Sequence, residues 1–141
     1  MKQAIINLIV MMSLLQACGG YSKGPTQNDI IGSWRNPDGA EFVFNTDGTF
    51  SGKRIPTKLG FMTTDSLKNK KFNGSGKWVL RKGSTHWEVN VDFDKVDNGK
   101  NGCVFPLLIS RENEVLENQP PWYLFIWEEE EGGERYKFSK H

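Results

Sequence analysis

Residues 87–94 alternate strictly between apolar and polar side chains, and this pattern constrains the fold more than any other segment of the chain. The segment reads Trp-Glu-Val-Asn-Val-Asp-Phe-Asp. A period of two sends successive side chains to opposite faces of an extended strand, whereas a helix would distribute the apolar residues around its circumference. We therefore expect a β-strand with Trp87, Val89, Val91 and Phe93 in a core and the intervening polar residues in water.

Strand patterns of the same kind run through most of the chain. They cover residues 30–35, 41–45, 49–55, 76–82, 103–111, 122–128 and 134–140. Most of the turns between them are short, and in the turn before residue 49 Gly48 supplies the positive φ that a tight turn needs. Pro106 indicates a bulge or a strand end, and Gly74 and Gly76 are interpreted as turn formers. Residues 56–73 are compatible with either a short helix or a mobile, lysine-rich loop.

These patterns predict an all-β domain, an antiparallel up-and-down meander of about eight strands that closes into a small barrel. Closure is favoured because it removes exposed sheet edges. The 9 Phe, 5 Trp and 3 Tyr residues can fill such a barrel completely or leave an apolar pocket inside it. The sequence is compatible with both arrangements.

The first eighteen residues have the parts of a bacterial export signal. Lys2 supplies a positive start, an apolar run follows over residues 5–15, and Leu-Gln-Ala-Cys closes the segment at Cys18. This tetrapeptide resembles the lipobox of bacterial lipoproteins, which implies cleavage before Cys18, a thioether diacylglycerol on its sulfur and an acyl chain such as palmitate on the new amino terminus. An ordinary secretory signal and a spanning helix are the alternatives, and a span needs about 20 apolar residues.

The resemblance divides the chain into a signal peptide (residues 1–17), an acylated N-terminus with a flexible tether (18–28) and one barrel domain (29–141). By the sorting rule of enteric lipoproteins, Gly19 implies an outer-membrane anchor with the domain facing the periplasm. Loss of Lys2 from the 18 Lys and Arg residues leaves 17, against 17 Asp and Glu, so the mature chain has no basic excess for binding nucleic acid. Cys103 then has no disulfide partner and is interpreted as a small core residue.

Two pairs of motifs resemble those of bacterial lipocalin-like domains. Ile-Gly-Ser-Trp ends at Trp34 and precedes Phe-Val-Phe-Asn-Thr-Asp-Gly-Thr-Phe at residues 42–50, and the closing pair lies at residues 123–127 and 133–138. The resemblance implies that Trp34 packs across the closed end of the barrel, with Arg135 as the candidate cation over its indole face. This pair would be structural rather than catalytic.

No enzyme, metal or cofactor signature stands out in the sequence. His86 has no second His, Cys or paired carboxylate at metal-ligand spacing, and no Gly-x-Ser-x-Gly elbow precedes a helix. Asp92, Asp94 and Asp97 lack the Glu of an EF-hand loop and are interpreted as a solvated face. The acidic run at residues 128–131 is interpreted as a charged hairpin tip, with a contact patch for a basic partner as the alternative.

Two functional hypotheses follow. The first is a lipid-anchored lipocalin-like module of the bacterial envelope that holds a small apolar or amphipathic ligand. The second is a protein-protein interaction module of the envelope, an assembly factor or an inhibitor or immunity-type lipoprotein, with a filled barrel. Its support is the long loops, since binding residues tend to lie on loops over a rigid scaffold. In both hypotheses the membrane is reached through the lipid anchor, and the chain is not an enzyme.

Overall fold

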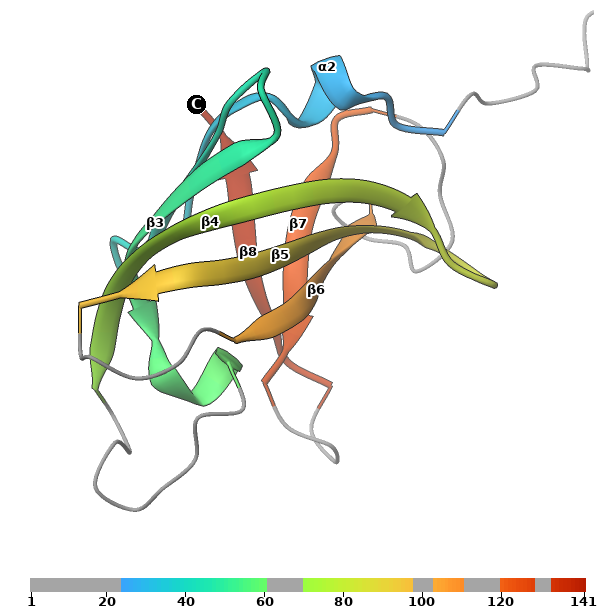
Figure 1. The fold of residues 1–141 in the computed structure, drawn as a ribbon. Coiled ribbons are helices and arrows are strands. Elements are labelled where there is room, and N and C mark those ends of the chain that lie inside the picture. Colours follow the sequence, from blue (N-terminus) through green and yellow to red (C-terminus); the bar gives the residue numbers. More distant parts are fainter. Residues whose placement is uncertain (1–23, 61–69, 98–102, 111–119, 129–132) are drawn as a thin grey trace, which may run out of the picture.

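A computed structural model describes residues 24–60, 70–97, 103–110, 120–128 and 133–141. Each strand pairs antiparallel with the next, and the last pairs with the first, so that the sheet closes into a barrel (Figure 1). The strands are β1 (Gly32–Arg35), β2 (Glu41–Phe44), β3 (Thr49–Pro56), β4 (Lys71–Lys82), β5 (Trp87–Val96), β6 (Val104–Ser110), β7 (Tyr123–Trp127) and β8 (Arg135–Lys140). Two short helices accompany them, α2 (Gln27–Ile30) before β1 and the 3-10 helix η2 (Thr57–Gly60) after β3. The predicted all-β barrel is confirmed.

The predicted alternation in β5 is confirmed from Val89 to Asp94, whereas Trp87 is only partly buried against the core. Val89, Val91 and Phe93 are at most 1 % exposed, whereas Asp92 and Asp94 are exposed on the outer face. The inward side chains therefore form one wall of the core, and the carboxylates of the outer face are solvated, as a half-buried antiparallel strand requires.

β4 is longer than predicted, and the interpretation of its glycines as turn formers was wrong. Gly74 and Gly76 lie inside the strand, beside a register shift between Ser75 and Gly76 in the pairing with β5. A Cβ on Gly76 would collide with the backbone carbonyl of Asp92, and one on Gly74 would press on the Phe93 ring. Glycine is present here because the β5 backbone approaches closely, a usual role of glycine at a bulge.

The turn between β2 and β3 has the predicted form. Gly48 has φ 80°, and the Asp47 carboxylate accepts hydrogen bonds from the backbone N–H and the hydroxyl of Thr49 at 2.9 and 2.6 Å. The Trp78 backbone N–H donates to the Gly48 carbonyl at 2.8 Å, and its indole N–H donates to the Asn45 carbonyl at 3.1 Å. The turn is thus held against β4.

Aromatic rings from facing strands meet in the described part of the interior. Phe42 lies 5.1 Å from Phe138 and 6.4 Å from Phe93, measured between ring centroids. Phe93 in turn contacts Phe72 and Phe105 at 5.2 and 5.9 Å. Three of these four pairs are tilted or edge-on and the Phe93–Phe105 pair is stacked, and ring pairs at these distances add specific contacts to the hydrophobic burial. The described aromatic side chains thus contact one another across the interior of the barrel.

Pro106 lies within β6 at a position without a bulge, contrary to the prediction. It also precedes the residues of β6 that pair with β7. The Phe93 N–H donates to the Cys103 carbonyl at 2.9 Å, so the alternation of an antiparallel ladder makes Asn90 and Pro106 a non-hydrogen-bonded pair. The missing N–H of Pro106 therefore faces away from β5. In the described chain, β6 pairs with β7 only through Leu108, Ile109 and Ser110.

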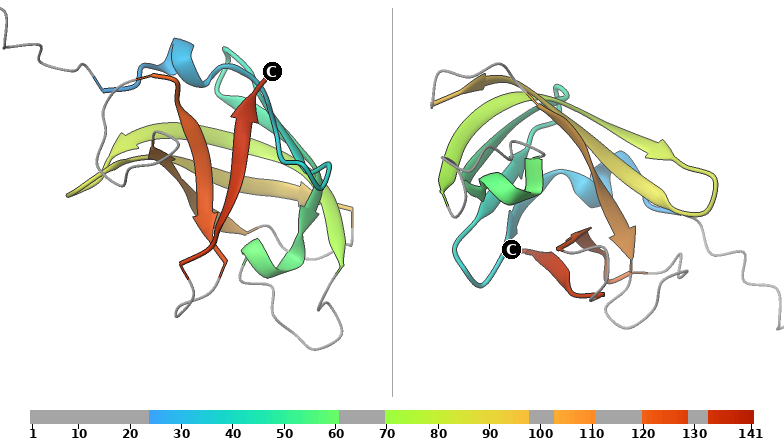
Figure 2. Two further views of the ribbon diagram at one scale, coloured as in Figure 1. Left: turned by 180° about the vertical axis from the view of Figure 1, so that it is seen from behind. Right: turned by 90° about the horizontal axis from the view of Figure 1, so that it is seen from below.

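The two helices lie at opposite ends of the barrel (Figure 2). Residues 24–28 fall within the predicted flexible tether, yet the first two are packed, whereas residues 26–28 are exposed. Pro25 is buried, and a Cβ on Gly24 would collide with the Trp87 indole. Ile30, at the end of α2, is fully buried. The packed domain therefore includes residue 24, ahead of the predicted start at residue 29.

Candidate ligand pocket at the α2 end of the barrel

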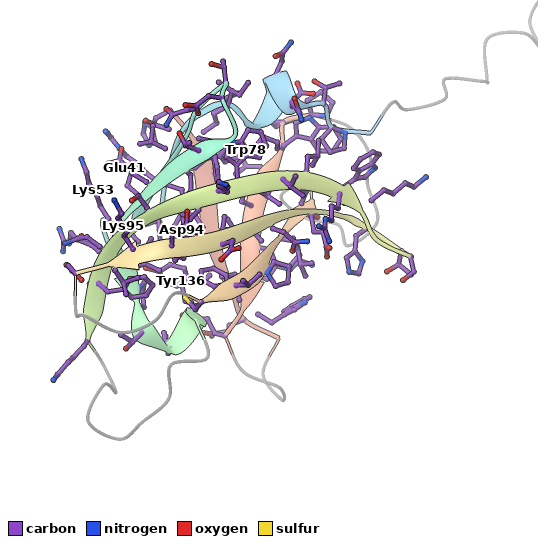
Figure 3. The ribbon with its side chains drawn as sticks, in the orientation of Figure 1. Glu41, Lys53, Trp78, Asp94, Lys95 and Tyr136 are labelled. Carbon is purple, nitrogen blue, oxygen red and sulfur yellow. The ribbon has the colours of Figure 1, made fainter. Side chains whose placement is uncertain are left out.

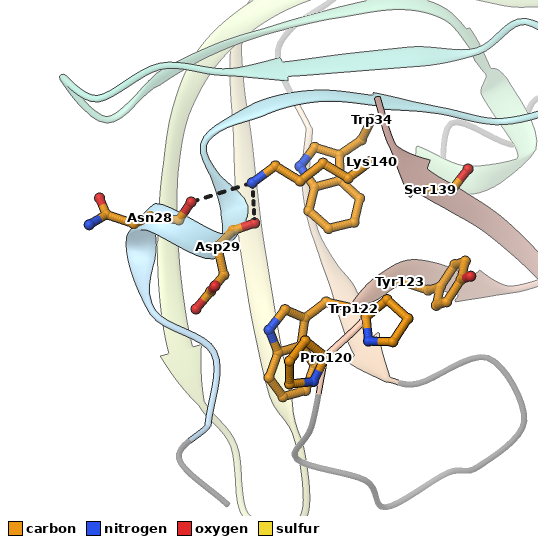
Figure 4. A pocket seen from close by; sticks show the side chains of 9 residues that line it. Asn28, Asp29, Trp34, Pro120, Trp122, Tyr123, Ser139 and Lys140 are labelled. Carbon is orange, nitrogen blue, oxygen red and sulfur yellow. Dashed lines mark hydrogen bonds between the residues drawn. The ribbon is translucent and has the colours of Figure 1, made fainter.

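A hollow of about 310 Å³ opens at the end of the barrel that carries α2 (Figure 4). It spans the seam where β8 meets β1, which consists of the pairs Trp34–Lys140 and Arg35–Ser139. Its walls come from α2, β1, β8 and the residues that lead into β7, so the closed meander brings both ends of the domain together here. The lining residues are Asn28, Asp29, Trp34, Pro120, Pro121, Trp122, Tyr123, Ser139 and Lys140.

Trp34 forms the inner wall, as its predicted place at the closed end implies. It is 1 % exposed, and its indole N–H donates to the Ile30 carbonyl at 2.6 Å. That bond satisfies the only polar atom of the side chain and also a carbonyl at the end of α2. Trp34 therefore fixes the short helix over the barrel end.

The cation over Trp34 is Lys140, and the assignment of Arg135 to this place was wrong. The Lys140 ammonium lies 5.8 Å from the Trp34 ring centroid, whereas the Arg135 guanidinium lies 4.7 Å from Phe125 and 4.9 Å from Trp127. The two cations stand at opposite ends of β8. At a rise of about 3.3 Å per residue, the strand separates them by roughly 16 Å, which is too far for Arg135 to reach Trp34.

Lys140 also binds the backbone of α2. Its ammonium donates to the Asp29 carbonyl at 2.7 Å and to the Asn28 carbonyl at 3.4 Å (Figure 4). A cation near the C-terminal carbonyls of a helix is favourable. These bonds hold the Lys140 ammonium against the backbone of α2 at the edge of the hollow.

Asp29 is ionised, and its charge is held within α2. Its carboxylate accepts the backbone N–H and the hydroxyl of Thr26, both at 2.7 Å. The side-chain bond from Thr26, then the backbone bond, and more weakly the charge of Lys140 lower the pKa of Asp29 against the opposing effect of burial. The carboxylate is thus committed to the N-terminus of the helix rather than to the pocket.

Prolines and a tryptophan form the outer wall. Trp122 is 8 % exposed and follows the cis peptide bond between Pro120 and Pro121. Figure 4 shows the Trp122 and Pro120 rings across from Trp34 and Lys140. The hollow therefore has aromatic and aliphatic walls with a few polar atoms at its rim, a composition suited to binding a small molecule.

The remaining candidate residues are placed as follows. Cys18 lies outside the described residues. Cys103 is partly buried against the core, and burial followed by the charge of Asp92 raises the pKa of its thiol, which fits the interpretation as a core residue rather than a nucleophile. His86 lies in the β4–β5 turn, where its Nδ1 is 2.7 Å from the Thr85 hydroxyl. Of the acidic run, Glu128 is described, and the residues after it are not.

Asp97, the third carboxylate of the rejected calcium loop, has a structural partner. It accepts a hydrogen bond from the Asn73 side-chain amide at 2.8 Å. Within the described ranges, no group of three His, Cys, Asp or Glu residues is arranged to hold a metal ion. A second hollow, of about 410 Å³, is lined by polar residues of β3, β4 and β5 that include Ser51, Ser75 and Asp94.

The sequence predicts a structural role for Trp34 and does not predict the residues of the pocket. The sequence predicts a loop that ends at Pro120 and Pro121 and a strand that begins at Trp122, and neither prediction indicates that these residues form a rigid apolar wall. Lys140 carries no comparable signal, because its role depends on the register between β8 and β1.

The chain matched no protein-family model, no curated protein and no solved structure in three comparisons. In the part of the chain that the structure describes, no helix has the length and apolar character to cross a bilayer. The function must therefore be argued from the pocket and the sequence themselves.

Proposed function

We propose that this chain is a lipid-anchored protein of the bacterial envelope that binds a small apolar or amphipathic ligand in the pocket at the α2 end of its barrel. The observation that carries the proposal is the hollow of about 310 Å³ between Trp34 and Trp122. Its volume is at the lower end of the range for small-molecule sites, roughly 300–1,000 Å³. The rings that meet inside the barrel argue for this end rather than for the centre.

The proposed anchor would keep the pocket close to the membrane. Cys18 would carry the acyl chains, and Gly24, the first residue that the structure describes, is packed on the barrel. At an extended reach of about 3.3–3.6 Å per residue, the intervening chain spans roughly 20 Å at most. The pocket, which α2 helps to line, would then lie on the periplasmic side of the outer membrane and close to the bilayer. Apolar molecules concentrate in the bilayer.

Ligand binding is tested with residues 19–141, which include every described residue. An environment-sensitive apolar dye and a fatty acid are titrated against tryptophan fluorescence, and saturable binding in the micromolar range is expected. Trp122→Ala should abolish it, whereas Trp127→Ala, at the other end of β7, should leave it unchanged. Equal affinity of both variants would place the ligand elsewhere and refute the proposed site.

The anchor is tested separately in cells. Labelled palmitate should appear on the protein and disappear from the Cys18→Ala variant. If the label is absent from the unmodified chain, or persists in the variant, the lipoprotein part of the proposal fails while the pocket is unaffected.

A protein-protein interaction module is the second candidate, and exposed apolar side chains on the outer wall favour it. Val79, Val104 and Trp127 are 42 %, 61 % and 42 % exposed. An apolar surface marks a contact site where its residues adjoin one another, and on this wall Val79 and Pro106 lie on either side of Asn90. Loss of an envelope partner from a Val104→Asp, Trp127→Ala double variant, with dye binding retained, would support this function instead.

A further inference from the structure

Three tryptophan side chains in the described chain are more than nine-tenths buried, and their indole N–H groups differ in one respect. Trp34, Trp78 and Trp122 are 1 %, 6 % and 8 % exposed. The N–H of Trp34 donates to the Ile30 carbonyl at 2.6 Å, and that of Trp78 donates to the Asn45 carbonyl at 3.1 Å. Among the described residues, the N–H of Trp122 has no such acceptor. A buried indole N–H usually has a partner, so this donor requires an explanation.

The Trp122 N–H is open to the hollow at the α2 end of the barrel. In the described chain, the unpartnered side-chain atom that is closed to solvent is the hydroxyl of Tyr136, which lies at the η2 end (Figure 3). The Trp122 N–H is not closed off in this way, and Trp122 lines the hollow of about 310 Å³. Figure 4 shows its nitrogen on the edge of the ring that faces α2. A molecule in the hollow can therefore reach this donor.

Other polar side chains around the hollow are bonded or point away from it. The Lys140 ammonium donates to two carbonyls of α2, and the Asp29 carboxylate accepts two hydrogen bonds at the start of the same helix. The Ser139 hydroxyl donates to the Arg35 carbonyl at 3.5 Å. The Asn28 side chain extends away from the hollow in Figure 4. The free indole N–H is therefore the buried donor that a ligand would complete.

The chemistry of the indole and the charges beside it determine which group fits. An indole N–H is a donor only, so its partner must be an acceptor. A carboxylate would be repelled by the ionised Asp29, and the Lys140 ammonium that could offset this repulsion is already bonded to α2. Burial of a charge without a full partner is costly. An ammonium group would place a donor against a donor. A neutral acceptor such as a carbonyl oxygen meets neither difficulty.

We infer that the pocket selects a compact ring compound with a neutral carbonyl group, whose oxygen accepts the Trp122 N–H. The inference rests on the proposed function and adds the chemistry of the ligand to it. The rings of Trp34, Pro120 and Trp122 line the hollow (Figure 4), so a flat ring can make offset or edge-on contacts with the indoles. The volume of about 310 Å³ is small for a ligand site and favours a compact molecule.

Three probes of similar size and shape separate the carbonyl group from the ring that carries it. Acetophenone has a neutral carbonyl, isopropenylbenzene has a methylene group in place of the oxygen, and benzoate has a charged carboxylate. Each probe is titrated against the full chain in a maltoside detergent, and the indole N–H signals of the 5 tryptophans are followed by NMR. Acetophenone should move the Trp122 proton downfield, because a hydrogen bond deshields it. Isopropenylbenzene should bind without this shift, and benzoate should bind most weakly.

Trp122→Phe keeps an aromatic ring and removes the N–H, and the signal missing from its spectrum identifies Trp122. This variant should weaken acetophenone binding about threefold to tenfold more than it weakens isopropenylbenzene binding, as the loss of one neutral hydrogen bond predicts. Because each probe is compared between variants in the same detergent, its partition into micelles cancels. Trp127→Phe is the matched control, since Trp127 lies at the other end of β7, and it should change neither affinity.

The outcomes separate this inference from the proposed function. Equal weakening of both neutral probes by Trp122→Phe would overturn the inferred ligand chemistry and leave the pocket standing, as would tighter binding of benzoate than of acetophenone. If no probe moves the Trp122 signal of the unmodified chain, the inference fails. If the apolar dye does not bind either, the proposed function fails with it.

Discussion

Replacement of Tyr136 by phenylalanine is expected to stabilise the barrel. A buried hydroxyl without a partner costs about 1–3 kcal/mol, because it loses its hydrogen bonds to water and gains none in return. Phenylalanine keeps the edge-on contact with Phe138, whose interplanar angle is 68°, and leaves no cavity beyond one oxygen atom. We therefore expect the free energy of unfolding to rise by about 1–2 kcal/mol and the melting temperature by about 3–8 °C.

The pH dependence supplies a second readout of the same substitution. The ordinary tyrosine pKa is 10.0 and that of Tyr136 is about 12, so the unfolded chain loses this proton at a lower pH than the folded chain. The stability that depends on the protonated hydroxyl is complete below pH 10 and is lost as the pH rises toward 12. A two-unit difference corresponds to at most about 2.7 kcal/mol. The Tyr136→Phe variant has no hydroxyl to ionise, so its free energy of unfolding should fall less steeply between pH 10 and pH 12.

Both readouts come from urea unfolding followed by fluorescence, at neutral pH and at intervals up to pH 12. Tyr123→Phe serves as the control, because Tyr123 lies at the α2 end of the barrel and is partly exposed. A Tyr136→Phe variant that is less stable than the unmodified chain at neutral pH would show that the hydroxyl has a favourable partner. Parallel pH profiles for the two proteins would refute the electrostatic part of the reasoning.

Three further expectations concern the α2 end and the β4–β5 wall. Trp34→Ala should lower stability by about 3–5 kcal/mol, measured by thermal or urea unfolding, because a large buried side chain is lost; an unchanged melting temperature would refute its structural role. Gly76→Ala should cost about 1–3 kcal/mol in the same assay, since its methyl group would collide with the Asp92 carbonyl, and wild-type stability would contradict this. Asp29, whose pKa lies below the ordinary 3.8, stabilises α2 in its ionised form. The difference in melting temperature between the unmodified chain and Asp29→Asn should therefore be largest at neutral pH and should shrink as the pH falls below 3.8. A difference that stays constant with pH would argue against this role of the Asp29 carboxylate.

The strands could be predicted because their signal is local. From Val89 to Asp94 of β5, buried side chains alternate with less buried ones, and every strand of the barrel pairs antiparallel with the next one in the chain, so no crossover partner has to be guessed. The start of β4 could not be predicted, because Gly74 and Gly76 are usual turn residues and only the closeness of the β5 backbone makes them strand residues here.

The candidate pocket was harder to predict because it depends on register. Arg135 and Lys140 are both cations on β8, and the sequence offers no reason to prefer the second. The pairing of Trp34 with Lys140 decides which cation covers the indole. Likewise, the end of the tether carries polar and glycine residues typical of a flexible segment, and the packing of Gly24 on Trp87 becomes visible only when residues far apart in the chain are brought together.

The short pairing between β1 and β8 affects the order in which the barrel folds and the place where it opens locally. Every other pairing joins strands that are neighbours in the chain, so those hairpins can zip together with little loop-closure entropy. The β1–β8 seam joins the two ends of the domain through two residue pairs, and we expect it to form last and to open first. The candidate pocket lies across this seam. A bound molecule would therefore contact both β1 and β8 and stabilise the strand pairing that we expect to open first. Binding would then slow hydrogen exchange most strongly in β1 and β8.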